Sequence, residues 1–273
     1  MAGSMPDGAR ALQRASEGIA READRLSALF ARQLAKVLRD ADRQVREWLA
    51  RQPARPTPRA RAQIGRIVRP GFEDLAAAAV IPFEDIAGRV VASRRAAGVP
   101  VNTSMMSAAR LESWRDWHHS DLLDEASVLS RQVAAVVMRS EGRARRRLVD
   151  DLTRIFDSAE SRTITLYDTA VSIFGRQVEA EHAGDDATTP FVYMGPVDTK
   201  TRDFCLRHVG KVYTRAEIDA LDNGQLNNVF LTGGGYNCRH VWQEIAKSSE
   251  LHETGEAHEI RDEVAEIRLK RAA

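Results

Sequence analysis

Residues 9–51 read ARALQRASEGIAREADRLSALFARQLAKVLRDADRQVREWLAR, with no proline to interrupt them. Apolar side chains recur here in steps of four and three residues, a period of about 3.67 residues, which places one stripe along a nearly straight helix. At about 1.5 Å per residue this helix is about 65 Å long. The stripe consists of Ile19, Ala23, Leu26, Phe30, Leu34, Val37, Ala41, Val45 and Trp48.

An apolar stripe of this length must be covered, because a large exposed apolar surface is unfavourable in water. Two arrangements cover it: packing on another helix, or binding to a partner protein. In the second arrangement the partner-binding residues are the large members of the stripe, Leu26, Phe30, Leu34, Val37, Val45 and Trp48.

Prolines and glycines divide the chain after this helix. The three prolines between Pro53 and Pro58 end it, since proline removes a backbone donor and fixes φ. We therefore assign residues 1–52 to a long amphipathic helix, 53–70 to a proline-rich hinge and 71–183 to a helical region. Within that region, helices are expected at about 72–96 (interrupted at Pro82), 104–118, 119–140 and 142–183.

The pattern changes at Gly184, where a polar loop leads to a short apolar run, Phe191–Met194, that is typical of a strand. We expect a small module of short strands and helices over 184–245 and a C-terminal helix within 246–273. The predicted fold is therefore mainly α, with an elongated helical N-terminal region followed by a small α+β C-terminal domain with short strands.

Composition narrows the class of protein. The chain has 43% hydrophobic and 29% charged residues, as soluble globular proteins do. No apolar run approaches the roughly 18 residues of a membrane span, and no signal-peptide pattern begins the chain. Two cysteines among 273 residues exclude a disulfide scaffold. We expect a protein made in the cytosol, with no membrane partner.

Positive charge is concentrated at the N-terminus. Residues 1–69 contain 15 Arg and Lys against 7 Asp and Glu, although the whole chain has a net charge of only +1. Of the 40 basic residues 35 are arginine, whose planar guanidinium binds phosphate and carboxylate groups. The excess suits a polyanion or an acidic protein surface, and the codon bias of a GC-rich genome explains it equally well.

The segment Tyr193–Trp242 reads YMGPVDTKTRDFCLRHVGKVYTRAEIDALDNGQLNNVFLTGGGYNCRHVW. The short oxygen side chains of Asp198 and Thr201 predict a turn or a helix N-cap. Thr214–Glu217 matches a capping box that opens a short helix. The glycines Gly233–Gly235 allow the backbone to approach another element closely.

This segment resembles the C-terminal domain of the phage Mu F-like minor head proteins, also called phage head morphogenesis proteins. In that family an Asp is followed by Thr-Cys-x-x-Cys, then by Gly-Lys-Val-Tyr/Phe and later by His-Pro-Asn-Cys-Arg-Cys. The resemblance covers 50 of the 273 residues. The positions that match the motif are Asp198, Thr201, Cys205, Gly210, Lys211, Val212, Tyr213, Asn237, Cys238 and Arg239. Gly234 and Gly235, just before its second half, are expected to be structural residues of the same segment.

Three positions depart from the family pattern. Arg202 stands at the first cysteine of Cys-x-x-Cys, Gly235 at the histidine of His-Pro-Asn-Cys, and His240 at the last cysteine. The family's four cysteines look like a structural zinc knuckle. In this chain two cysteines and two histidines make up an alternative set of four zinc ligands: Cys205, His208, Cys238 and His240.

The other interpretation is a module without metal or other cofactor. Cys205 and Cys238 then lie close together as small buried residues. Asn237 and Arg239 hold backbone groups, with Arg239 paired to Asp198. We favour this interpretation over the zinc site.

The resemblance implies a virion structural protein rather than an enzyme. Such a protein is a minor head component, present in multiple copies near the portal vertex and in the host cytoplasm before assembly. Its implied partners are the portal protein and the major capsid protein, with packaged double-stranded DNA as a further contact. The alternative is a DNA-binding internal or ejected virion protein, favoured by the N-terminal charge and by Arg143–Arg147. A zinc-binding enzyme is the least favoured function.

Overall fold

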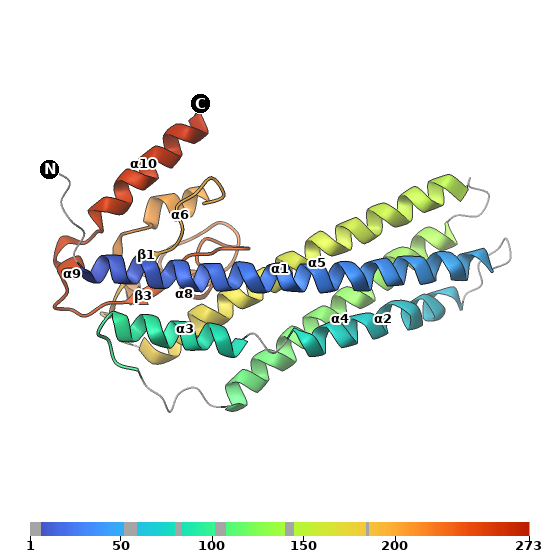
Figure 1. The fold of residues 1–273 in the computed structure, drawn as a ribbon, viewed down its shortest axis with the longest axis horizontal. Coiled ribbons are helices and arrows are strands. Elements are labelled where there is room, and N and C mark those ends of the chain that lie inside the picture. Colours follow the sequence, from blue (N-terminus) through green and yellow to red (C-terminus); the bar gives the residue numbers. More distant parts are fainter. Residues whose placement is uncertain are drawn as a thin grey trace. The chain divides into compact units, whose positions relative to one another are not determined.

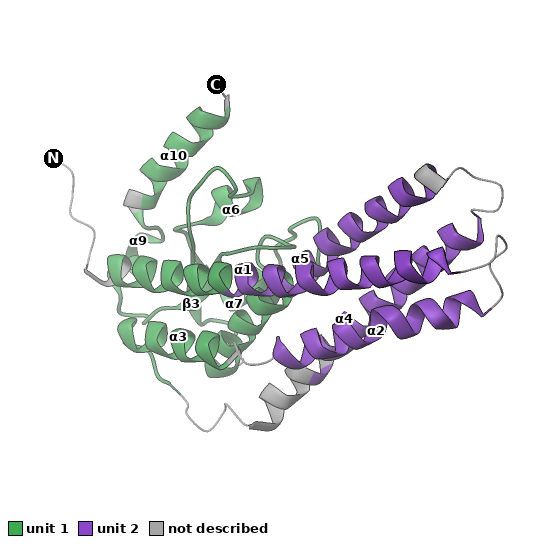
Figure 2. Cartoon of the chain, turned by 45° about the vertical axis from the view of Figure 1, so that its right-hand side comes forward, with its two compact units in different colours: residues 1–25, 82–108, 168–273 green, residues 26–81, 109–167 purple. Residues whose placement is uncertain are grey.

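The computed structural model describes residues 7–51, 59–79, 83–101, 108–139, 145–183 and 186–272. It is mainly helical with one small antiparallel sheet, as the sequence predicts (Figure 1). The chain forms two compact units (Figure 2). Unit 1 comprises residues 1–25, 82–108 and 168–273, and unit 2 comprises residues 26–81 and 109–167.

Unit 2 is a helical bundle in which the helices run side by side (purple in Figure 2). The ring of Phe30 stacks on that of Tyr167 at 4.0 Å. Gly71 lies so close to Val37 that a Cβ atom at Gly71 would be 2.8 Å from that side chain. The helices that contribute to the bundle of unit 2 are α1 (Asp7–Ala50), α2 (Ala60–Ala78), α4 (Ala108–Met138) and α5 (Arg145–Ala183).

The predicted stripe lies inside the protein. Phe30, Leu34 and Val45 are at most 1% exposed, Leu26 is 2% exposed and Trp48 is 9% exposed, while Val37 is half-buried beside Gly71. Of the two arrangements that the sequence allowed, the structure has the first, in which the chain's own helices cover the stripe. The apolar pattern therefore gives no reason to expect a partner protein on these residues.

The predicted hinge at 53–70 extends too far, and the predicted break near residue 118 is wrong. Residues 60–70 belong to α2, which contains Pro70 and buries Ile64, Val68 and Phe72 on one face. The apolar spacing in this stretch outweighs Pro70, and residues 52–58, with the other three prolines, lie outside the described residues. The two helices expected at 104–118 and 119–140 form the single helix α4.

Unit 1 is built around the sheet, whose strand order is β2-β1-β3 and whose strand pairs are both antiparallel. Phe191 on the central strand pairs with Tyr213 on one side and Glu244 on the other. The strands are β1 (Pro190–Met194), β2 (Val212–Thr214) and β3 (Val241–Glu244). The helices around them are α3 (Phe83–Ala96), α6 (Asp203–His208), α7 (Arg215–Asp219), α8 (Val229–Thr232), α9 (Glu250–Thr254) and α10 (His258–Ala272).

The predicted module boundary of 184–245 is too narrow. Unit 1 also includes the first turns of α1, the helix α3 and the last turns of α5. Leu12 of α1 and Ile260 of α10 join the same buried cluster as the sheet residues. A core made by a segment of about 60 residues is marginal, and these helices add apolar surface to it. Among the described helices, none has an apolar stretch long enough to cross a bilayer.

A buried arginine ties the outer helices of unit 1 to the sheet. Arg94 of α3 is 2% exposed and donates to Glu179 of α5 at 2.7 Å and to Glu244 of β3 at 2.6 Å. It also donates to the carbonyl oxygen of Pro100. Although Arg94 works in the opposite direction, burial raises the pKa of Glu179 from 4.5 to about 7.

This raised pKa predicts a pH-dependent stability. The folded state keeps the Glu179 proton up to about pH 7, whereas the unfolded chain loses it near pH 4.5. The contribution of Glu179 to the free energy of unfolding is therefore greatest below pH 4.5 and is lost as the pH rises to about 7. We expect Glu179→Gln to remove this pH dependence, which amounts to at most about 3 kcal/mol in the free energy of unfolding across the window.

The measurement is urea unfolding of both proteins at several pH values across that window. Glu253→Gln, at an exposed position of α9, is the matched control and should leave the slope unchanged. A slope equal in the wild-type protein and in Glu179→Gln would contradict the assignment.

Candidate functional site

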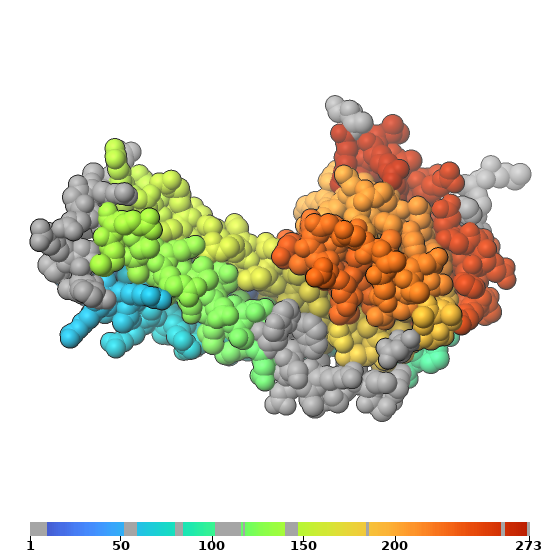
Figure 3. Space-filling model, turned by 180° about the vertical axis from the view of Figure 1, so that it is seen from behind, coloured from blue at the N-terminus to red at the C-terminus, as the bar shows by residue number. Residues whose placement is uncertain are grey.

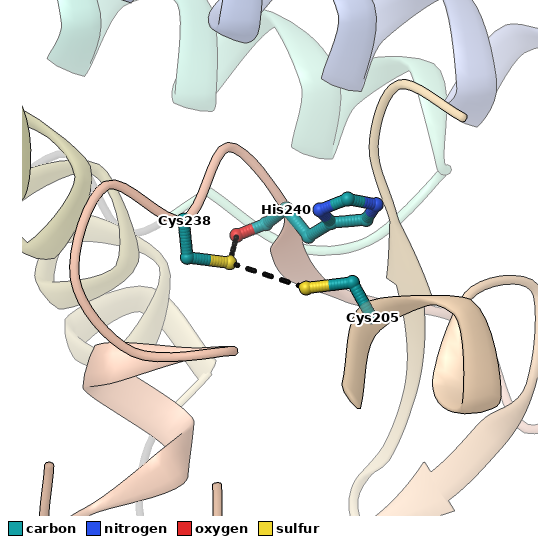
Figure 4. Close-up of side chains that lie close together, drawn as sticks. All are labelled: Cys205, Cys238 and His240. Atoms are coloured by element: carbon teal, nitrogen blue, oxygen red, sulfur yellow. Dashed lines mark hydrogen bonds between the residues drawn. The ribbon is translucent and has the colours of Figure 1, made fainter. Parts of the chain in front are cut away.

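The two cysteines meet in the interior of unit 1. Cys205 lies on α6 and Cys238 lies in the loop before β3, and both are free thiols. Their sulfur atoms are 3.7 Å apart and point toward each other (Figure 4). The hydroxyl group of Tyr193, from β1, hydrogen-bonds with Cys238 Sγ at 3.2 Å and with Cys205 Sγ at 3.5 Å. The prediction that the cysteines lie close together and buried is confirmed.

Arg176 of α5 holds the loop that carries Cys238. It is 1% exposed and donates to the carbonyl oxygens of Leu231 at 3.0 Å, Cys238 at 2.7 Å and His240 at 2.9 Å. Among the described residues no carboxylate lies within ion-pair distance of this guanidinium. Since a buried charge requires compensation, the Cys238 sulfur is its nearest candidate counter-charge.

The two thiols differ in acidity. Burial by itself raises the pKa of Cys238, but the hydrogen bond with Cys205 and the positive charge of Arg176 outweigh it, so that this pKa lies well below its ordinary value. The Cys238 sulfur also accepts the N–H of Gly234 at 3.1 Å. Cys205 keeps its proton, because its hydrogen bond with Cys238 and its burial raise its pKa. Of the two thiols, Cys238 is therefore the one that loses its proton more readily.

Three of the four predicted zinc ligands converge. The ligand atoms of Cys205, Cys238 and His240 all lie within 4.8 Å of one another. His240 is 2% exposed, its ring stacks on Tyr193, and its Nε2 atom has no hydrogen-bond partner among the described residues. The sulfur separation is close to the roughly 3.8 Å edge of a tetrahedron with Zn–S bonds of about 2.3 Å.

The fourth predicted ligand, His208, lies elsewhere. Its Nδ1 atom is 2.7 Å from the hydroxyl oxygen of Tyr213, and its ring packs on Phe204. Burial, Lys211 and Arg207 lower its pKa to about 4, so this ring is neutral near pH 7. The prediction that His208 completes the set is therefore wrong: its position at the end of α6 turns its ring toward β2.

The two halves of the sequence motif are joined by an ion pair. Arg239 donates to both carboxylate oxygens of Asp198, at 2.6 and 2.7 Å, as predicted. Asp198 also accepts from Thr201 and from the backbone N–H of Lys200, which makes the predicted turn. Burial by itself raises the pKa of Asp198, but the hydrogen bond and the positive charge of Arg239 lower it below its ordinary value.

The motif glycines sit where a side chain would collide. A Cβ atom at Gly234 would lie 2.5 Å from the Cys205 sulfur, and one at Gly235 would lie 2.3 Å from Gln225. Gly210 and Gly235 have φ angles of +83° and +95°, in the left-handed region that favours glycine. Asn237 also has a positive φ and hydrogen-bonds through its backbone N–H to Thr169 of α5. These residues shape the backbone of the site rather than its chemistry.

Sequence reasoning missed three polar contributors to the site. Arg176 has the only available signal, since it stands in an apolar helical stretch between Phe174 and Val178. Tyr193 has none, because a tyrosine in a short strand is ordinary. Arg202, at the position of the family's first cysteine, donates to the carbonyl oxygen of Gly234 at 3.1 Å.

Comparison of the chain with protein-family models, with curated proteins and with solved structures finds no match in any of the three.

Replacing Arg176 should destabilise unit 1 strongly. Arg176→Met leaves three buried carbonyl oxygens without their donors, and we expect the free energy of unfolding to fall by about 3–5 kcal/mol. Arg176→Lys keeps the charge but not the three donors, so an intermediate loss is expected. Arg21→Met, at a side chain that is 70% exposed, should change stability by no more than about 0.5 kcal/mol. Urea unfolding measures the stability of all three variants. Equal stability of Arg176→Met and Arg21→Met would show that the three hydrogen bonds of Arg176 do not stabilise unit 1.

We expect the purified protein to contain far less than one zinc per chain. Tyr193 and the Gly234 N–H already hydrogen-bond with the sulfurs, and Arg176 supplies the positive charge that a metal would bring. Elemental analysis of protein prepared with added zinc tests this. Near one zinc per chain, lost in His240→Ala and kept in His208→Ala, would show that the three converging residues bind metal.

Proposed function

We propose that this chain is a virion structural protein of a bacteriophage, a minor head component that associates with the portal vertex during head assembly. Its partners are the portal protein and the major capsid protein, and it is present in multiple copies per particle. Unit 1 is the module that carries the Mu F-like motif, and the module acts by its shape and surface rather than by catalysis.

The observation that supports this proposal is the joining of the two motif halves in space. Asp198 comes from the first half and Arg239 from the second, and they form a two-oxygen ion pair. Cys205 and Cys238 also come from the two halves. They are 33 residues apart in sequence, and their buried sulfur atoms are 3.7 Å apart. Residues of a chance resemblance have no reason to be mutual partners, whereas residues of a shared module do.

DNA binding by the N-terminal residues is the alternative, and the structure reduces its main support. Several arginines of residues 1–69 already have acidic partners and are therefore less available to phosphate groups. The side chains of Arg143, Arg145 and Arg146 lie outside the described residues. The paired side chains are Arg21 with Glu17, Arg25 with Glu22, Arg43 with Asp40, Arg46 with Asp42, and Arg69 with Glu73.

The test is incorporation into particles. A phage that lacks this gene is supplied with the wild-type chain, Arg239→Ala or Arg215→Ala, and purified particles are quantified by mass spectrometry against the portal protein. We expect the wild-type chain and Arg215→Ala to be present at a fixed ratio to the portal. Arg239→Ala should be reduced, because it leaves the half-buried Asp198 without its partner.

Arg215 is the matched control: its side chain is 21% exposed, as is that of Arg239, and it also pairs with an aspartate, Asp219, but within one helix. Its guanidinium also lies over the Phe230 ring at 4.0 Å, so the control includes the loss of a buried contact. Thermal unfolding of the free proteins separates loss of folding from loss of incorporation. Absence of the wild-type chain from particles at every stage of assembly would refute the proposed function.

A further inference from the structure

The helices α6 and α10 enclose a groove on the surface of unit 1. Two adjoining cavities, of about 340 Å³ and about 460 Å³, share Leu206, Arg207 and Arg268 in their walls. Val209 and Val264 contribute to an apolar floor. Figure 3 shows α10 (red) on the surface of unit 1.

The rim of this groove is basic, and part of its charge is not neutralised. Arg261 pairs with Glu256, and Arg271 pairs with Asp203. Arg207 and Lys211 are exposed, and among the described residues neither has a carboxylate within ion-pair distance. The cations of the rim are Arg207, Lys211, Arg261, Arg268 and Arg271.

The helix α10 carries its arginines on the groove side and most of its acidic residues on its other sides. Arg261, Arg268 and Arg271 follow one another at helical spacing on the groove side, along with the buried Val264. Asp262 and Glu266 lie roughly opposite, at a spacing of four residues. Lys270 follows them on the same face and pairs with Glu266 at 2.6 Å, so Asp262 is the acidic group of this face that has no ion pair among the described residues. Leu269 continues this acidic face one turn further and is 72% exposed.

We propose that the groove between α6 and α10 binds the α10 helix of a second copy of this chain. Leu269 of the second copy enters the apolar floor, and its Asp262 pairs with Arg207 and Lys211 at the rim, where its Glu266 exchanges Lys270 for the same cations. The acidic face and the basic groove are different surfaces of one molecule. The contact is therefore head-to-tail and extends to a ring or an open chain.

A second copy fits these surfaces better than a nucleic acid does. A polyanion in the groove would leave the acidic face of α10 without a partner of opposite charge. It would also leave Leu269 exposed. Another copy of the chain satisfies the basic groove, the acidic face and the exposed leucine in one contact, with the interspersed signs that direct protein association.

The experiment is sedimentation velocity of the full chain across a concentration series at about 0.1 M and about 1 M salt, between which the Debye length falls from about 10 Å to about 3 Å. The basic-reversed variant carries Arg207→Glu and Lys211→Glu. The acidic-reversed variant carries Asp262→Lys and Glu266→Lys. The control for added negative charge carries Lys200→Glu and Lys247→Glu, both exposed and outside the groove.

We expect the wild-type chain and the control to self-associate at low salt and to dissociate at high salt. Each reversed variant alone should raise the dissociation constant by about tenfold or more, since both of its surfaces then carry the same sign. An equimolar mixture of the two variants should associate again, and so should one chain that carries all four substitutions.

Three outcomes overturn the proposal. One is a wild-type chain that stays monomeric at low salt. Another is association that the reversals do not weaken, or that the mixture does not restore. The last is a monomeric chain that binds duplex DNA in fluorescence anisotropy and loses this binding in the basic-reversed variant, which would assign the groove to nucleic acid.

Discussion

The guanidinium of Arg176 is the interaction on which unit 1 depends most. Its donors bind the carbonyl oxygen of Leu231 at the end of α8 and those of Cys238 and His240 in the following loop, which carries these two residues into the interior. The loop contains two glycines and one asparagine with positive φ, so it has little regular hydrogen bonding of its own. Its buried carbonyl groups must accept hydrogen bonds from outside the loop, and the planar guanidinium of Arg176 on α5 donates them.

Unit 1 contains a second buried arginine, and the two are compensated differently. Arg94 meets the carboxyl groups of Glu179 and Glu244, so acidic side chains on other elements oppose its charge. Arg176 meets carbonyl dipoles and the sulfur of Cys238. The first arrangement is sensitive to pH in the range where a buried glutamate titrates, and the second depends on the state of a thiol. Their chemical sensitivities therefore differ although both tie helices to the sheet.

The sequence predicted those features whose signal is local. The spacing of the apolar stripe in residues 9–51 gave a helix that the structure has as α1, and Thr214 with Glu217 forms the predicted capping box. The pair Asp198 and Arg239 was found because both are motif positions. Features that depend on distant pairing were missed, such as β3, whose four residues become a strand only beside β1. The start of α2 was missed because the prediction there rested on the local effect of proline on the backbone. It did not include the burial of Ile64 and Val68, which favours the helix.

Where this chain differs from the Mu F-like motif, arginine side chains supply positive charge and hydrogen bonds. A metal bound by four cysteines would bring positive charge to the sulfurs and join the two segments that carry them. In this chain Arg202 takes the place of one cysteine and binds the carbonyl oxygen of Gly234, so it joins the same two segments by a hydrogen bond. Arg176 brings positive charge to Cys238 from a third element. Gly234 approaches the cysteines closely, and two arginines supply the charge and the links. The connection between the two segments therefore does not depend on a bound metal.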